Sequence, residues 1–261
     1  VMSLAGRTFS LIRVPTVADI QEEEKSRQEI EALQLDTPSG PQMLVISDKW
    51  AIGREGSGQP VAINVTHPRV SRIGRQAQIT YQDGSFSITD LDSSNGTFLN
   101  DELLRPMQPQ KLFFRNKRCE ISVGGGREPP RKGNCRFNVE SIDGPNQVLR
   151  ISLSPAILNK PDTTQMSEGW AGLLEEATRT WVLGASEIFV GSDPDCGVYI
   201  PDATDKGFKV AVTRSQGKYL FSSIGPAEVL LNGSALGEQK EVSHGDVLTF
   251  GEANISIGAI P

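Results

Sequence analysis

The run Asp90–Asn100, with the sequence DLDSSNGTFLN, constrains the fold of this chain more than any other segment. It joins the apolar-polar alternation of Phe86–Asp90 to the short apolar run Thr97–Leu99 through an Asn-Gly pair. Asn-Gly between two such runs is typical of a tight turn between β-strands. Small hydroxyls and backbone N–H groups in a turn of this kind can bind an anion. The run therefore predicts a strand, an anion-binding loop and a second strand.

Further strand-like segments surround this loop. Each is a short apolar run bounded by turn residues such as glycine, asparagine or proline. The predicted strands include Met43–Ser47, Ala62–Val65, Gln78–Tyr81, Phe86–Asp90 and Thr97–Leu99. Short strands at regular spacing with such turns favour a β-sandwich.

Three motifs occur in a fixed order: Ile52-Gly53-Arg54, then Val70-Ser71-Arg72, then Asp90–Asn100. Together they resemble the signature of the forkhead-associated (FHA) domain family. The resemblance implies a β-sandwich that binds phosphothreonine peptides through its loops. An arginine suits this chemistry, because its planar guanidinium donates a fork of hydrogen bonds to phosphate oxygens.

The resemblance also implies a role for individual residues. Arg54 stands where the family's arginine contacts the phosphate, and Ser94 where a loop hydroxyl assists it. Asn95 stands where an asparagine holds the peptide main chain, and its side chain offers both a donor and an acceptor. Gly96 and Thr97 match residues that shape the loop.

One region departs from the family pattern, which usually has a serine three residues before a histidine. Gln76 stands at the histidine position, and Ser71 lies two residues too early. In the family the histidine supports the binding loops and does not touch phosphate, which makes glutamine tolerable there. Which side chain this loop contributes to the phosphate stays open among Ser71, Arg72 and Arg75.

The chain contains an internal repeat, because Met43–Arg54 and Trp181–Ser192 both read apolar strand, polar turn, apolar strand and glycine. We therefore expect an all-β fold of two FHA-like β-sandwich domains, 1–143 and 144–261. In the second copy Ser192 replaces the phosphate-binding arginine, and Ser222–Ala227 lacks the Asn-Gly pair. The second domain is expected to be structural or protein-binding.

Each copy is expected to carry a helical insertion. Thr16–Leu35 has a capping-box pattern and opposite charges four residues apart, and Ser167–Thr178 has apolar residues at helical spacing. The first helix is expected to pack by one edge on its own sandwich, with partner binding as the alternative. The second is expected to pack on its own domain or at the seam between the domains. The segment Arg115–Arg136 is rich in basic residues and glycine, which indicates a solvated loop or a basic surface for acidic partners.

Composition limits the remaining classes. The formal net charge of -6 argues against a dominant nucleic-acid role. No apolar run approaches the roughly 18 residues of a membrane span, and no signal peptide is evident, so we expect a cytoplasmic protein, with a nuclear location open.

Cys119, Cys135 and Cys196 show no metal-ligand spacing and are expected to be reduced thiols, with a Cys119–Cys135 disulfide across a hairpin as the alternative. No catalytic motif, metal site or cofactor site is found, and we expect no enzyme activity.

The expected function is that of a phosphothreonine-peptide-binding signalling or scaffold protein. The predicted partner is a phosphothreonine-containing protein or peptide, such as a Ser/Thr kinase or its substrate. The alternative is a phosphate-independent interaction scaffold, for example within a secretion or multiprotein assembly, that uses the helical insertions or the basic loop.

Overall fold

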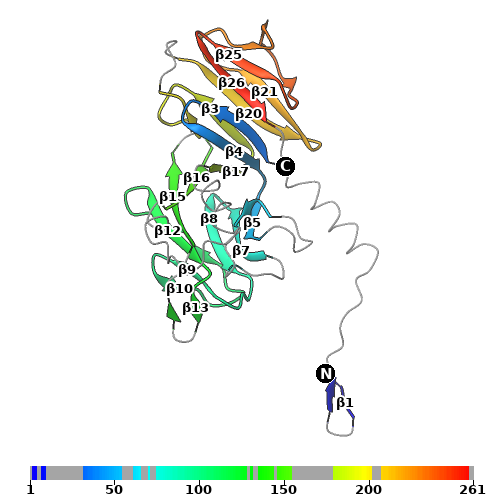
Figure 1. Ribbon diagram of the computed structural model, residues 1–261, viewed down its shortest axis with the longest axis vertical. Helices are drawn as coiled ribbons and strands as arrows, with labels where there is room; N and C mark the ends of the chain where they lie inside the picture. Colours follow the sequence, from blue (N-terminus) through cyan, green and yellow to red (C-terminus); the bar gives the residue numbers. More distant parts are fainter. Residues whose placement is uncertain are drawn as a thin grey trace, which may run out of the picture.

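The structure is a computed structural model, and it describes most of the chain (Figure 1). The described residues are 2–4, 7–9, 32–54, 61–65, 70, 75–127, 130–131, 135–143, 146–154, 179–201 and 207–258. All regular structure in these residues is β-strand, and no helix occurs among them. The predicted all-β class is therefore confirmed for the described part of the chain.

One large sheet runs through the molecule, and two five-stranded sheets pack against it. In spatial order, its strands are β10 (Glu102–Leu103), β9 (Thr97–Leu99), β12 (Arg118–Val123), β15 (Cys135–Ile142), β16 (Val148–Leu153), β17 (Thr180–Gly184), β4 (Gly40–Ile46), β3 (Leu33–Thr37), β26 (Ala253–Gly258), β25 (Val247–Phe250), β22 (Leu230–Leu231) and β23 (Ser234–Ala235).

The two five-stranded sheets each come from one half of the sequence. The first has the order β11 (Gln110–Lys111), β8 (Ser85–Asp90), β7 (Arg75–Gln82), β5 (Lys49–Gly53) and β6 (Ile63–Asn64). The second has the order β19 (Val198–Tyr199), β18 (Glu187–Gly191), β20 (Lys209–Ser215), β21 (Lys218–Ser223) and β24 (Lys240–Glu241). Two separate hairpins are formed by β1 (Met2–Leu4) with β2 (Arg7–Phe9), and by β13 (Gly126–Arg127) with β14 (Pro130–Arg131).

Strand β8 illustrates how sequence alternation becomes a half-buried strand. Phe86, Ile88 and Asp90 are buried, and the residues between them are partly exposed. The turn from β7 to β8 places Asp83 and Gly84 at positive φ angles of 51° and 72°. Two consecutive residues in that region form the tight hairpin turn that matches the twist of the flanking strands.

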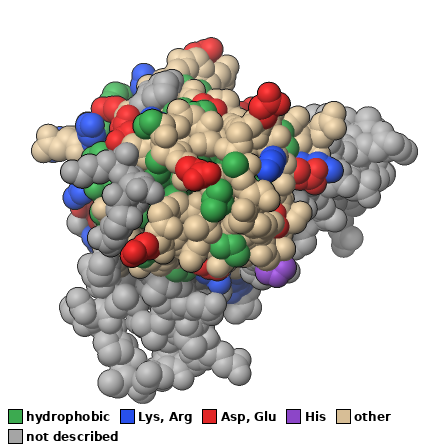
Figure 2. Space-filling view, turned by 90° about the horizontal axis from the view of Figure 1, so that it is seen from above, with side chains coloured by type: hydrophobic (Ala, Val, Ile, Leu, Met, Phe, Trp, Pro, Cys, Tyr) green, Lys and Arg blue, Asp and Glu red, His purple; other side chains and the backbone are tan. Residues whose placement is uncertain are grey.

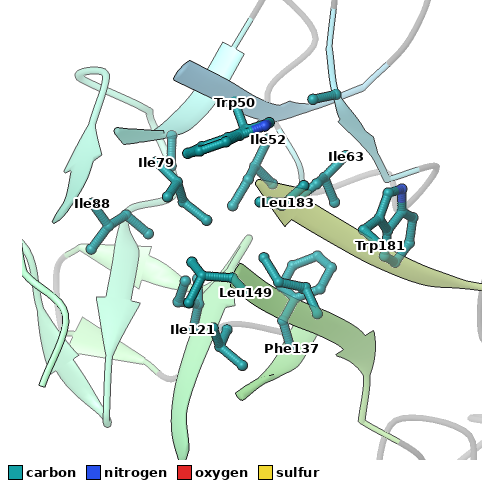
Figure 3. Close-up of a cluster of buried hydrophobic side chains, with 14 of the residues drawn as sticks. Trp50, Ile52, Ile63, Ile79, Ile88, Ile121, Phe137, Leu149, Trp181 and Leu183 are labelled. Atoms are coloured by element: carbon teal, nitrogen blue, oxygen red, sulfur yellow. The ribbon is translucent and has the colours of Figure 1, made fainter. Parts of the chain in front are cut away.

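Two groups of buried side chains hold the sheets together, and we call them the first and second core clusters. In the first, Trp50, Ile52, Ile79 and Ile88 of the first five-stranded sheet face residues of the large sheet (Figure 3). The facing residues include Ile121, Phe137, Leu149, Trp181 and Leu183. In the second cluster, Ile188, Val210 and Phe221 of the second five-stranded sheet pack with Leu35, Phe250 and Ile255 of the large sheet. Two sheets packed through apolar faces in this way form a sandwich.

The core clusters do not follow the expected boundary between residues 143 and 144. Leu33 and Leu35 of β3 belong to the second cluster, and Leu149 and Ile151 of β16 belong to the first. Figure 1 shows the blue strands β3 and β4 beside the yellow-to-red strands at the top of the molecule. Each cluster therefore draws residues from both sides of that boundary.

The expected helix at Thr16–Leu35 is wrong at its end. Leu33–Leu35 lies in strand β3, where Leu33 and Leu35 are buried and Gln34 between them is partly exposed. That two-residue period belongs to a strand and not to a helix. Residues 16–31 and the whole of the second expected helix, Ser167–Thr178, lie outside the described residues.

The three cysteines are free and buried. Strands β12 and β15 pair so that Cys119 lies opposite Val139 and Cys135 lies opposite Val123. The two thiols are therefore at opposite ends of the hairpin, and a disulfide between them would require a different register. Burial raises the pKa of the Cys119 thiol to about 12 and contributes most to raising that of Cys196 to about 11.

Candidate functional site

Arg54 lies directly after strand β5, which pairs with β7 on one side and with β6 on the other. Its side chain is half-buried, and among the described residues it makes no hydrogen bond or ion pair. Strands β5 and β7 pair regularly up to Ile52 and Ala77, and then Gly53 lies opposite Arg75. Gln76 is thus an extra residue, a β-bulge of the kind that re-aims side chains at the end of a strand.

Gln76, the residue at the expected histidine position, is fully buried and holds the adjacent loop. Its Nε2 donates one hydrogen bond to Ser93 Oγ at 2.6 Å and one to the backbone oxygen of Gly96 at 2.9 Å. The bulged residue of β7 is therefore the one whose side-chain amide binds the loop between β8 and β9. The expectation that glutamine can replace histidine at this position has a structural basis in these two bonds.

Asp90 holds the same loop from the end of β8. Its carboxylate accepts a hydrogen bond from the Ser93 backbone at 3.0 Å and one from Ser93 Oγ at 2.6 Å. Asp90 and Ser93 are both buried, so these bonds are formed away from water. Ser93, whose side chain connects Asp90 to Gln76, could not be singled out from the sequence.

The loop presents two of the predicted residues at the surface. Ser94 is exposed, and Asn95 is half-buried. Gly96 is buried with a φ angle of 72°, a conformation that favours glycine. Thr97 begins strand β9 opposite Val123 and is buried, and its Oγ1 has no hydrogen-bond partner in the structure. Gly96 therefore has the conformation that the turn into β9 needs, and Ser94 and Asn95 are the accessible polar side chains of the loop.

Arg75 is the described member of the three alternatives left open for the neighbouring loop. It begins β7 opposite Gly53, next in register to Arg54, and its side chain is half-buried. Its Nε is buried without a hydrogen-bond partner. An unpaired buried guanidinium N–H is costly and is available to an incoming acceptor. Ser71 and Arg72 lie outside the described residues.

Comparison with models of protein families gives a match that covers this site. Residues 50–123 match the family model of the FHA domain, and they include Arg54, Gln76 and the loop from Ser93 to Thr97. The chain belongs to the FHA-domain family. No curated protein matches the chain in sequence.

Solved FHA domains resemble about a third of the chain. The FhaA FHA domain, solved in complex with the intracellular domain of Rv3910, is 30% identical, with 36% of this chain and 90% of that chain covered and a TM-score of 0.25. An FHA domain of an Arabidopsis thaliana hypothetical protein is 26% identical, with 36% and 77% covered and a TM-score of 0.27. A structure from a study of phosphothreonine-dependent FHA domain interactions is 26% identical, with 36% and 88% covered and a TM-score of 0.25.

The second half of the chain has a different arrangement where the FHA domain has its loops. Gly191 lies opposite Lys209 with no bulge, and Ser192 follows Gly191 where Arg54 follows Gly53. Ser192 Oγ accepts a hydrogen bond from the Gly207 backbone at 3.0 Å. A side-chain carbon added at Gly225 would lie 2.2 Å from the Gly207 oxygen, so these two backbone segments are in tight contact. Here the loops contact one another through their backbones.

The ammonium group of Lys209 is not free to bind a phosphate in place of the missing arginine, because it already has partners in its own half. It lies 4.0 Å from a carboxylate oxygen of Asp195 and 4.6 Å from the centre of the Phe189 ring. Figure 2 shows the molecule from above, at the end nearest β25 in Figure 1. On this face the described acidic and basic side chains are scattered among each other, so the described residues form no continuous basic patch there.

The basic segment Arg115–Arg136 is largely neutralised where the structure describes its side chains. Lys117, Arg118 and Arg136 pair with Asp143, Glu140 and Glu120 at 3.1, 3.5 and 3.4 Å. Arg115 is exposed and has no ion pair among the described residues. These pairings reduce the positive field that the sequence predicts for this segment.

No group of three or more His, Cys, Asp or Glu side chains among the described residues could hold a metal ion. None of the described segments forms a helix with the length and apolar character needed to cross a membrane.

Proposed function

We propose that this chain is a phosphothreonine-peptide-binding interaction protein, and that its FHA domain binds the phosphate through Arg54 and Ser94. Asn95 binds the peptide main chain beside the phosphothreonine. The observation that carries the proposal is the position of Arg54. It lies half-buried at the end of β5 and bonds to none of the described residues, and Gln76 of the paired strand β7 holds the loop between β8 and β9 together with Asp90.

The chemistry favours phosphate over an unmodified threonine. A phosphate group brings three strong acceptor oxygens and nearly two negative charges, and a hydroxyl brings neither. A charge-assisted hydrogen bond contributes roughly 1.5–3 kcal/mol, and several of them less ordering costs correspond to micromolar affinity, near -8 kcal/mol. The held loop keeps the ordering cost low, because Ser94 and Asn95 already lie on a fixed backbone.

Arg75 is proposed as the second cation of the site. Its Nε has no internal acceptor, and the β-bulge places it in register beside Arg54. Ser71 and Arg72 remain proposed contributors from the same loop, and Gly96 and Thr97 remain proposed to set the loop conformation. The partner is proposed to be a protein phosphorylated on threonine, such as a Ser/Thr kinase or its substrate.

The second half, 144–261, is proposed to be an FHA-like unit with a structural or protein-binding role, following the first unit, 1–143. Its loops support this assignment, since Ser192 is engaged by Gly207 and Lys209 by Asp195. The rival function is phosphate-independent binding through the basic segment or the helical insertions. The ion pairs of Lys117, Arg118 and Arg136 count against the basic segment in that role.

An arrayed library of phosphothreonine peptides and their unphosphorylated counterparts tests the proposal on the intact chain. The expected result is binding to a subset of phosphorylated peptides that Arg54→Ala abolishes. Arg115→Ala is the matched control, because it removes the same charge from an exposed position beside Arg118, at the end of β12 away from Thr97. Equal binding of phosphorylated and unphosphorylated peptides by folded protein would overturn the proposal.

A further inference from the structure

Strands β4 and β17 lie side by side in the middle of the large sheet and pair in parallel. The pairing register places Leu44 beside Val182, the two residues that the internal repeat aligns. Both strands are buried on both faces. Met43, Trp181 and Leu183 belong to the first core cluster, and Leu44 and Val182 belong to the second. Their near-continuous apolar sequences fit this position between two layers.

The strands outside this central pair are exchanged between the halves of the chain. Strand β3 precedes the first five-stranded sheet in sequence, but it pairs with β26 and buries Leu33 and Leu35 in the second cluster. Strand β16 precedes the second five-stranded sheet, but it pairs with β15 and buries Leu149, Ile151 and Leu153 in the first cluster. Each half of the chain therefore contributes a strand to the sandwich core that is otherwise formed mainly by the other half.

Hydrogen bonds between the two halves reinforce the exchange. Tyr219 of β21 donates a buried hydrogen bond to the Leu44 oxygen at 3.1 Å. The Ser47 backbone donates to the Gly184 oxygen at 3.0 Å, where β4 and β17 both end.

We infer that the second half serves as the structural complement of the FHA domain: the two halves are interlocked by exchange of β3 and β16 and fold as one cooperative unit. The second half lacks the phosphate-binding arginine, but it supplies β16 and β17 to the first core cluster. It also pairs along β4, the strand that leads through Ser47 and Asp48 into β5 and Arg54. If the chain were divided at residue 143, the first half would lose the buried side chains that β16 and β17 contribute to the first core cluster.

A pair of introduced cysteines in the full chain tests the exchange. Asp36 and Ser256 are exposed and opposite each other on β3 and β26. Residues paired in this way have Cα atoms about 4.5–5.5 Å apart, within the range for a disulfide. Asp36→Cys with Ser256→Cys is expected to give a disulfide within one chain, seen on a non-reducing gel and as linked peptides by mass spectrometry. The native thiols are buried and do not compete.

The matched control combines Asp36→Cys with Asn138→Cys. Asn138 is exposed on β15, and β16, β17 and β4 separate β15 from β3. Four strand spacings put these positions about 19 Å apart, too far for a disulfide. A disulfide in this control pair would show that β3 completes its own half and would overturn the inference. So would a 36–256 disulfide that forms only between two copies of the chain.

Cooperative folding is tested by a core substitution in one half and a probe in the other. In a Trp170→Phe background the remaining tryptophans are Trp50 and Trp181, both in the first core cluster. Phe221→Ala creates a cavity in the second core cluster. It is expected to lower the urea midpoint of unfolding, followed by the fluorescence of Trp50 and Trp181, by about 1 M. Ile255→Val is the milder second variant, with a smaller shift in the same direction.

An unchanged tryptophan midpoint, with faster hydrogen exchange confined to residues 207–258, would show independent halves and overturn the inference. Neither test involves a phosphopeptide. A failure here is therefore distinguishable from a failure of the proposed phosphate binding.

Discussion

Replacing Gln76 with leucine tests whether the buried amide holds the loop between β8 and β9, which is proposed to bind phosphate. Leucine has nearly the same volume and no polar atom, so the change removes the bonds to Ser93 Oγ and the Gly96 oxygen. Each bond is worth about 0.5–1.5 kcal/mol net, and buried acceptors left unpaired cost more. The expected loss is about 2–3 kcal/mol in the free energy of unfolding. With a urea m-value of about 3 kcal/mol per M, the midpoint falls by about 0.7–1 M.

The same variant is expected to bind a selected phosphothreonine peptide about tenfold more weakly, because ordering even one freed loop residue costs about 1–2 kcal/mol. Fluorescence polarisation below the unfolding transition measures this loss separately from stability. Gln76→His is the matched comparison, since an imidazole N–H can still donate one bond to the loop. If the urea midpoint of Gln76→Leu lies within about 0.2 M of that of the unsubstituted chain, Gln76 does not stabilise the loop.

Three further predictions concern single side chains. Arg54→Ala leaves the free energy of unfolding within about 0.5 kcal/mol, because Arg54 has no internal partner, while phosphopeptide titration shows lost binding. Ser94→Ala weakens binding about fivefold in the same titration, because one hydrogen bond of about 1 kcal/mol is removed from an exposed loop. Burial raises the pKa of the Cys119 and Cys196 thiols in the folded chain to about 12 and 11, above the ordinary thiol pKa of 9.0. Their contribution to stability is present below pH 9 and is lost as pH rises through the folded pKa values, so the urea midpoint falls above pH 9, and Cys196→Ser flattens that fall.

The sequence predicts the local parts of the site because they depend on neighbouring residues. The alternation of Phe86, Ile88 and Asp90 fixes the buried face of β8, and the Asn-Gly pair fixes the turn that follows it. The role of Gln76 could be expected only through the family resemblance. The link through Ser93 was missed, because a serine beside Ser94 carries no signal to distinguish the buried hydroxyl from the exposed one.

The strand exchange could not be predicted in the same way. Alternation in Leu33–Thr37 shows that one face is buried, but it does not say which strand is the neighbour. The charge pairs upstream favoured a helix through Leu35, and the pairing of β3 with β26 overrides that local preference. The Cys119–Cys135 alternative failed for a related reason, since hairpin register depends on how β12 and β15 meet.

A four-way titration shows whether Arg54 binds the phosphate of a phosphothreonine peptide. One selected peptide, with and without its phosphate, is titrated by calorimetry into the intact chain and into Arg54→Ala. The effect of the phosphate and the effect of Arg54→Ala on the binding free energy are expected to be coupled by about 1.5–3 kcal/mol, the contribution of a charge-assisted hydrogen bond. If Arg54→Ala weakens both peptides equally, or if the phosphate changes nothing, Arg54 does not bind phosphate and the proposed function is contradicted.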